Sequence, residues 1–154
     1  MDKDKALREH VLELLEGKSA HIDIESALKD FPADMINERP HRSPHSAWQL
    51  LEHIRIAQSD ILDFSRNPDY KEMKWPDDYW PKENGNPQRW NGSIKKVLDE
   101  LQEMRDLVSD DKKDLVAKIP WGSGQTILRE ALLIADHNTY HLGQIVLIKK
   151  MLNA

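Results

Sequence analysis

The sequence contains no cysteine, and this absence removes several kinds of chemistry before any motif is considered. Disulfides, thiolate nucleophiles, iron–sulfur clusters and cysteine-based zinc sites are excluded, so any bound metal must be held by imidazole or oxygen ligands. If thiol chemistry takes place on this protein, a small molecule has to supply the thiol.

The chain also lacks an excess of basic residues and a long apolar run. It has 22 Lys and Arg against 27 Asp and Glu, a net charge of -5, which gives no electrostatic footprint for nucleic acid or an anionic membrane. No apolar run approaches the length that crosses a bilayer, and the first ten residues are charged where a secretory peptide would be apolar. We therefore expect a soluble cytoplasmic protein that binds no nucleic acid and no membrane.

Patterns typical of β-strands are nearly absent, whereas apolar residues recur with helical spacing in four long stretches. A length of 154 residues suits one domain. We expect an all-α four-helix bundle that spans residues 1–154. The predicted long helices run over about 3–16, from 44 to near 67, from 87 to about 108, and from 127 to the C-terminus, with a short helix at about 24–29.

Capping residues define the starts of these helices. Ser43 is the expected N-cap of the second long helix, with Pro44 at the first helical position, where a missing N–H costs nothing. Asn86 and Pro87 precede the third, and Thr126 is the expected cap of the fourth. The fourth helix is apolar around much of its circumference, so we expect it to be the most buried.

The segment from residue 67 to 86 is too long for a tight turn between antiparallel helices, which usually needs two to eight residues. Some twenty extended residues can reach up to about 65 Å, more than the length of a helix here. We therefore predict a long crossover between the second and third helices and an up-down-down-up order. The aromatic residues of this crossover are Tyr70, Trp75, Tyr79 and Trp80. They either attach the crossover to the surface and cover one end of the bundle, or form a lid over a site.

Two histidines, His137 and His141, lie four residues apart in the last helix, within the segment HNTYHLGQI. Positions i and i+4 of a helix lie on one face about 6 Å apart, so two imidazoles there can bind one divalent ion. They interrupt an apolar stripe and are therefore predicted to point into the bundle. The stripe consists of Ile127, Ala131, Ile134, His137, His141, Ile145, Ile148 and Leu152.

His53 is the best candidate for a third ligand, because it follows Leu50 by three residues and precedes Ala57 by four and so also points inward.

Two interpretations of these three histidines stay open. Each imidazole could be a core side chain satisfied by a carbonyl or a tyrosine hydroxyl. Together they could bind a metal, which uses the ring nitrogens and offsets the cost of burying them. The other histidines lack helical partners and are expected to be solvated or locally hydrogen-bonded: His10, His21, His41 and His45.

Two amide side chains share helix faces with these histidines. Gln144 lies three residues after His141, and Gln49 lies four residues before His53. Either amide could orient a ligand or a bound water from outside the coordination sphere.

Other polar residues near the histidines are less promising. Asp136 and Glu52 are neighbours of ligands in sequence and so point about 100° away on the helix, where surface ion pairs are expected instead of general-base roles. Tyr140 is displaced from the ligand face in the same way and is expected to pack. The catalytic residues stay unassigned.

Two patterns carry a resemblance to a known family. The segments AWQLLEHI and ADHNTYHLGQIVLIKKML resemble the DinB-like (YfiT-like) four-helix-bundle metalloproteins, and the likeness covers nearly the whole chain in helix order, crossover and C-terminal motif. The resemblance implies that His53, His137 and His141 bind one divalent metal, with Gly-Gln-Ile after the last ligand. Some relatives use a carboxylate at one of these positions, and this chain does not.

Three neutral imidazoles would leave one or more coordination positions open for water or substrate, as catalytic sites do. Such an ion can activate a bound water or bind a small thiol as thiolate. Imidazole suits several metals, and zinc or nickel is expected.

Three functions remain open at this stage. The resemblance implies a thiol-dependent S-transferase or a metal-dependent hydrolase that acts on a small molecule. The ion could instead serve mainly to stabilise the bundle. The broad apolar circumference of the last helix could also form a homodimer interface and make the chain an interaction module.

Overall fold

The computed structural model describes residues 3–152, and the regular elements in that range are helices, apart from one isolated bridge between Lys118 and Thr126. The prediction of an all-α protein is confirmed. The elements are α1 (Lys3–Glu16), α2 (Ile24–Leu28), a short 3-10 helix η1 (Pro40–Arg42), α3 (Ala47–Arg66), α4 (Pro87–Ser109) and α5 (Ile127–Leu152).

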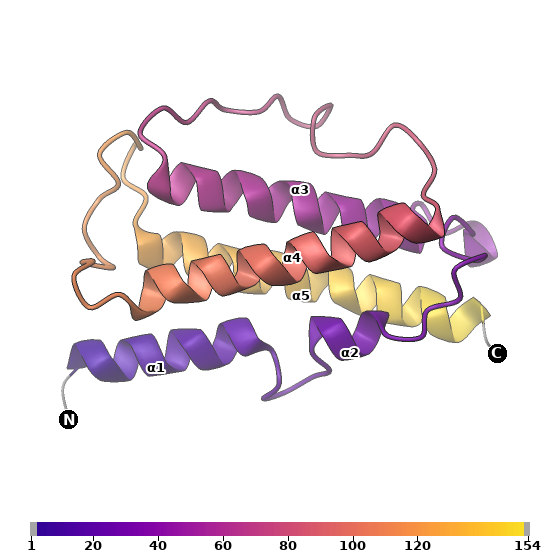
Figure 1. The fold of residues 1–154 in the computed structure, drawn as a ribbon, viewed down its shortest axis with the longest axis horizontal. Helices are drawn as coiled ribbons and strands as arrows, with labels where there is room; N and C mark the ends of the chain where they lie inside the picture. The colour runs from indigo at the N-terminus through magenta and orange to yellow at the C-terminus, as the bar shows by residue number, and fades with distance from the viewer. Residues whose placement is uncertain (1–2, 153–154) are drawn as a thin grey trace.

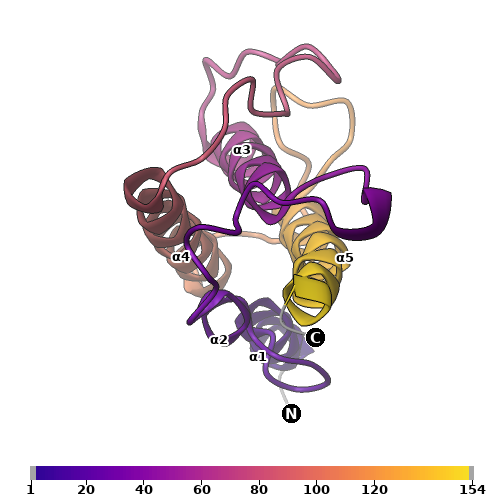
Figure 2. The ribbon, with the colours of Figure 1, turned by 90° about the vertical axis from the view of Figure 1, so that its right-hand side faces the viewer.

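The helices lie side by side along the long axis of the molecule (Figure 1). Seen from one end, α3, α4, α5 and the α1–α2 pair surround a common interior (Figure 2). The interior contains two apolar clusters. One joins α2 to the start of α3 and the end of α5, and the other joins α1 to the end of α3 and the start of α5. Burial of these amphipathic faces is what stabilises a bundle of this kind.

The connection from residue 67 to 86 passes along the outside of α3, from the end of that helix to the opposite end of the bundle, where α4 begins (Figure 1). It is attached near its end by Trp48, whose indole N–H donates to the Glu83 carbonyl over 2.8 Å. The amide of Asn37 also exchanges two hydrogen bonds with the backbone of Gly85. The crossover is thus held on the bundle at defined points.

The predicted start of the second long helix was wrong. Ser46, not Ser43, is the N-cap of α3: its hydroxyl accepts from the backbone N–H of Gln49, and the Gln49 side chain accepts from the backbone N–H of Ser46. This reciprocal capping box satisfies two N–H groups that a Ser43 cap would leave unpaired. Ser43 instead donates to the carbonyl of His45, and Pro44 precedes the helix.

The predicted cap of the last helix agrees with the structure, because Thr126 accepts from the backbone N–H of Arg129 at the start of α5. At the start of α4, Asn86 is the N-cap and accepts from the backbone N–H of Arg89. The expectation that α5 is the most buried helix was wrong, because α3 has 12 buried residues among 20 and α5 has 9 among 26. Leu132 and Tyr140 of α5 are exposed.

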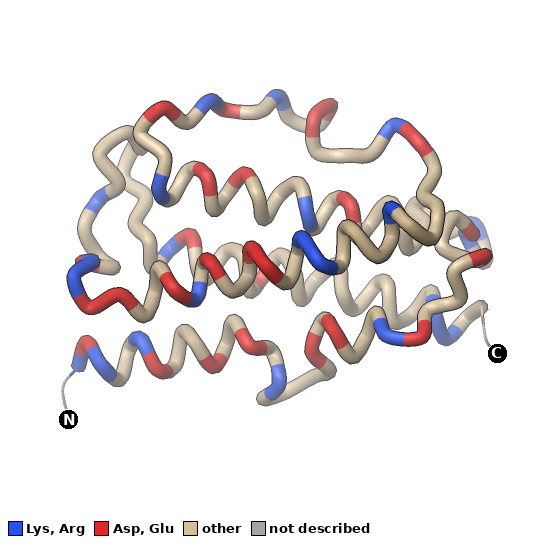
Figure 3. Tube along the Cα trace, viewed as in Figure 1, with Lys and Arg blue, Asp and Glu red and all other residues tan. Residues whose placement is uncertain are grey.

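Charged residues of both signs are interspersed along the helices and the crossover (Figure 3). Within residues 3–152, no helix combines the length and the apolar character needed to cross a membrane.

Candidate metal centre

The structure brings His53 of α3 together with His137 and His141 of α5. One nitrogen from each of the three rings lies within 4.8 Å of the others. His53 is 2% exposed and His141 8% exposed, and His137 is half-buried. The inward stripe of α5 therefore meets the inward face of α3 at a cluster of three imidazoles.

Hydrogen bonds fix the orientation of two of these rings. Nδ1 of His53 lies 2.8 Å from the carbonyl oxygen of Tyr79 and must donate to it, because a carbonyl only accepts. Nδ1 of His141 lies 2.8 Å from Oε1 of Gln144 and donates in the same way. In the neutral rings Nε2 then carries a lone pair, which is the form that binds metal, with the second nitrogen held by a hydrogen bond.

His137 is incompletely satisfied by the protein. Its Nε2 lies 3.1 Å from Nε2 of His53, and its Nδ1 is buried with no hydrogen-bond partner among the described residues. Because His53 presents a lone pair at Nε2, the contact is a hydrogen bond only if His137 carries its proton on its own Nε2. Nδ1 of His137 is then a buried acceptor without a donor. An orphaned buried nitrogen in a cluster of three imidazoles is unfavourable for a purely structural core.

Burial keeps these rings neutral. Desolvation, together with the neighbouring His141 and His53, lowers the pKa of His137 to about 4. Desolvation also lowers the pKa of His53 and of His141 below the usual value of histidine. Their hydrogen bonds to Tyr79 and Gln144 oppose the shift in part. Neutral imidazole is the state that ligates a metal, so the site is prepared for a cation at neutral pH.

A column of stacked rings covers the cluster. The indole of Trp80 stacks on His53 with ring centroids 4.0 Å apart and planes 2° apart. Its opposite face stacks on His45, with centroids 4.1 Å apart. The crossover residue Trp80 is therefore held between two imidazoles, one of them in the cluster. These contacts place the crossover over the candidate site and not over one end of the bundle.

A second contact attaches the crossover to α3. Asp60 accepts hydrogen bonds from the hydroxyls of Tyr70, over 2.9 Å, and Tyr79, over 2.6 Å. Burial and the Asp60 carboxylate raise the pKa of both tyrosines, which keeps the two hydroxyls protonated as donors. Because the carbonyl of Tyr79 accepts from His53, the Asp60 contact holds the group that orients this ring.

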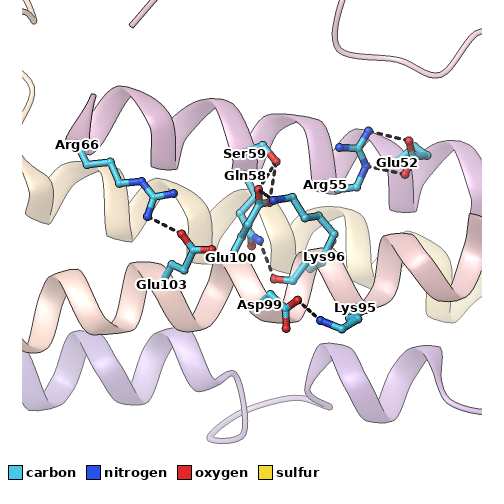
Figure 4. A network of polar contacts seen from close by, with 11 residues as sticks. Glu52, Arg55, Gln58, Ser59, Arg66, Lys95, Lys96, Asp99, Glu100 and Glu103 are labelled. Atoms are coloured by element: carbon cyan, nitrogen blue, oxygen red, sulfur yellow. Dashed lines mark hydrogen bonds and ion pairs between the residues drawn. The ribbon is translucent and has the colours of Figure 1, made fainter. Parts of the chain in front are cut away.

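A buried polar layer lies next to the cluster, between the two apolar clusters of the core. The amide of Asn138 donates to Gln58 over 2.7 Å, and Gln58 donates to the carbonyl of Val97 over 2.8 Å. Beside Gln58 in Figure 4, Glu100 of α4 accepts from Ser59 and pairs with Lys96. These contacts tie α3, α4 and α5 together at the level of the histidines.

The other polar residues singled out in the sequence lie elsewhere. Gln49 belongs to the cap of α3, where it also accepts from Arg39. Glu52 forms an ion pair as expected, with Arg55, but the expectation that it lies on the surface was wrong, because it is buried and also accepts from Ser93. Asp136 is exposed, as expected. Tyr140 is not packed in the core: it is 66% exposed, with its ring edge-on to His141.

Sequence reasoning missed the parts of the site that come from the crossover and the preceding loop. His45 was expected to be solvated or locally bonded, whereas its ring is half-buried against Trp80. Asp60 was not considered, although two tyrosines of the following segment bind it. The only signal for this part of the site in the sequence was the series of aromatic residues in the crossover. No periodicity relates these residues to His45 or Asp60.

The residues present fit a divalent cation. The donor set is three neutral imidazoles, two with a lone pair at Nε2 and one with an unpartnered ring nitrogen. Imidazole ligands of this kind suit zinc, nickel, iron and copper. A three-ligand protein site also leaves room for a substrate atom on the metal.

One of the comparisons with known proteins gives a match. The family model of the DinB superfamily matches residues 18–145, which include all three histidines. Neither a curated protein nor a solved structure gives a significant match to the chain.

Proposed function

The chain belongs to the DinB superfamily, and from this membership and its histidine cluster we propose that it is a metal-dependent enzyme acting on a small molecule. His53, His137 and His141 hold one divalent ion, zinc or nickel. The observation that carries the proposal is the convergence of three ring nitrogens within 4.8 Å, with two of the rings already oriented by hydrogen bonds.

The bound ion would supply Lewis acidity, which activates either a water for hydrolysis or a small thiol for S-transfer. The chain's own residues supply orientation and exclusion of solvent. The Tyr79 carbonyl and Gln144 hold two ligand rings by their Nδ1–H groups, and Trp80 covers the face of His53. Because the chain has no cysteine, a transferred thiol comes from a low-molecular-weight cofactor.

Conjugation of a small thiol to monochlorobimane by the zinc- or nickel-loaded protein tests the transferase form of the proposal. We expect turnover by the native chain and by His10→Ala, which removes an exposed histidine far from the cluster in sequence, and at least a hundredfold less by His141→Ala. Turnover of model esters in the same set of variants would instead assign a hydrolase. Equal rates in His141→Ala and the native protein for both reactions would refute the proposal.

The alternative is a non-catalytic bundle that the ion stabilises and that dimerises as an interaction module. The exposed Leu132 and Tyr140 of α5 favour a homodimer interface on that helix. Chelation would then lower the melting temperature of the protein, and no thiol or ester would be turned over.

The remaining features are part of the same proposal. The helices follow an up-down-down-up order within a single domain of residues 1–154, with the crossover of residues 67–86 bringing Trp80 over the site. The protein acts in the cytoplasm as a homodimer and requires neither nucleic acid nor a membrane.

A further inference from the structure

A cavity of about 270 Å³ lies where the start of α3 meets the end of α5. Its walls come from three parts of the chain: the loop before α3, Leu50 of α3, and the end of α5. The loop residues that line it are Pro40, His41, Ser43, Pro44 and His45, and those of α5 include Leu147, Ile148 and Met151. The volume is slightly below the range of sites that bind drug-sized molecules and suits a fragment-sized ligand.

The cavity lies one helical turn from the histidine cluster on both helices that carry it. Leu50 precedes His53 by three residues, and Gln144, which also lines the cavity, follows His141 by three. Three residues advance a helix by about 4.5 Å. Since Gln144 accepts from His141, one wall of the cavity is in direct contact with a proposed ligand of the metal.

A second wall connects the cavity to the cluster through stacked rings. His45 lines the cavity and stacks on Trp80, which stacks on His53. The loop that carries His45 has an unusual backbone, because His41 and Arg42 both adopt positive φ angles, 49° and 61°. Non-glycine residues in this region are uncommon and cluster at ligand clamps and other functional segments.

The lining determines what the cavity can bind. It contains no Lys, Arg, Asp or Glu, and its polar groups are imidazoles, one hydroxyl and the Gln144 amide near the cluster. The larger cavity under the crossover, about 870 Å³, is lined by several charged residues, among them the ion pairs of Arg55 with Glu52 and of Arg89 with Glu83. The smaller cavity therefore offers mainly apolar surface, and the amide of Gln144, which accepts from His141, marks the end nearest the histidine cluster.

We propose that the 270 Å³ cavity binds the apolar part of the substrate, and that the substrate is a small uncharged molecule whose polar reactive group extends from the cavity past Gln144 toward the metal. This inference rests on the proposed function for the position of the reactive group. The binding of the apolar part depends only on the cavity.

Two homologous series of probes test it. Linear hydroxamates, from acetohydroxamate to hexanohydroxamate, carry a metal-binding head group and a tail of increasing length, and are titrated into the zinc-loaded protein. Linear alcohols from propanol to hexanol lack a strong metal-binding group and are followed by ligand-observed NMR on the metal-free protein. We expect affinity in both series to rise by about fourfold per methylene until the cavity is filled.

A matched pair of variants locates the tail. Leu147 lines the cavity and is 53% exposed, and Val116, in the connection between α4 and α5, is 60% exposed and does not line it. Neither is a core residue, so both variants should fold. Leu147→Asn is expected to reduce the gain per methylene to below about twofold, and Val116→Asn is expected to leave it unchanged.

The outcomes separate this inference from the proposed function. Affinities that do not depend on tail length, or the same slope in both variants, overturn the cavity assignment even if zinc is bound. If the chain binds no zinc but the alcohols still bind with the expected slope, the proposed function fails and the apolar site stands. If the alcohols do not bind and sedimentation shows a dimer that Leu147→Asn dissociates, a second copy occupies this surface and the inference is wrong.

Discussion

At the scale of single residues, His53 is held by the crossover from two directions. Trp80 stacks on the face of the ring, and the carbonyl of Tyr79 accepts from its Nδ1–H. The Tyr79 side chain is itself bound to Asp60, which also binds Tyr70. One carboxylate on α3 therefore supports the segment that orients a candidate ligand on the same helix.

Tyr79→Phe and Tyr70→Phe form a matched pair that tests this support. Each removes one hydroxyl bound to Asp60, but only Tyr79 also contacts His53. Tyr79→Phe keeps the carbonyl that accepts from His53 and loses only the hydroxyl that anchors it to Asp60. Its effect should therefore lie at the lower end of the roughly tenfold to hundredfold loss of metal affinity that typically follows removal of an orienting group. We expect a zinc affinity lower by about tenfold in Tyr79→Phe and within about twofold of the native value in Tyr70→Phe, measured by competition with a chromophoric chelator. Equal affinities in the two variants would show that the Asp60 contact does not position the ligand.

The titration of the three histidines predicts how stability depends on pH. The pKa of His137 is lowered to about 4 in the folded protein, and those of His53 and His141 are also lowered, whereas the unfolded value is about 6.5. Between those limits the unfolded chain binds protons that the folded chain does not. The free energy of unfolding of the metal-free protein should therefore fall as pH decreases from about 6.5 toward about 4.

Urea titrations of the metal-free protein between about pH 7.5 and about pH 4.5 measure this effect. The decrease should be smaller in His137→Ala, which removes the histidine whose pKa is lowered to about 4. A slope that is identical in the native protein and in this variant would contradict the assignment of the shift to the cluster.

At the scale of secondary-structure elements, the crossover is attached by close packing as well as by hydrogen bonds. A Cβ added at Gly85 would overlap the indole of Trp48, which also donates to Glu83. Gly92 in α4 has open space where its Cβ would be. These two glycines therefore have different roles: one allows the crossover to approach α3, and the other only weakens a helix.

Gly85→Ala and Gly92→Ala are expected to change stability in opposite directions. The first should lower the free energy of unfolding by about 1 to 3 kcal/mol, because the packed indole or the crossover has to move. The second should raise it by up to about 1 kcal/mol, since alanine is the better helix former. Chemical denaturation measures both. A neutral Gly85→Ala variant would mean that the crossover is not fixed at this point.

The elements also show which parts of the fold follow from the sequence. The helices were predictable because their apolar residues repeat with helical spacing and because Asn86 and Thr126 are good caps. The start of α3 was misplaced, although the capping box of Ser46 and Gln49 was present in the sequence. Pro44 after Ser43 resembled a stronger start, and the left-handed backbone just before it could not be foreseen.

The candidate site was predictable to the extent that it depends on helix periodicity. His137 and His141 share a face by their spacing, and His53 points inward by its place between Leu50 and Ala57. The approach of the three histidines across α3 and α5 depends on tertiary packing, and so does the stack of His45 on Trp80. Such contacts leave no repeating signal in a single sequence.

At the scale of the whole molecule, the candidate site lies where three sets of contacts in the bundle meet. α3 and α5 supply the histidines, the polar layer of Gln58 and Asn138 connects both helices with α4, and the crossover covers the histidines from outside. A bound ion would therefore stabilise the folded chain as a whole, because the unfolded chain does not bring the three ligands together.

The affinity and stoichiometry of zinc binding, measured by calorimetry and metal analysis on the native protein and on His53→Ala, His137→Ala and His141→Ala, test the central claim most directly. The account predicts about one ion per chain in the native protein and, since each ring supplies one of three ligands, an affinity at least a hundredfold lower in each variant. His10→Ala should behave as the native protein. Native stoichiometry and affinity in any of the three variants would contradict the account.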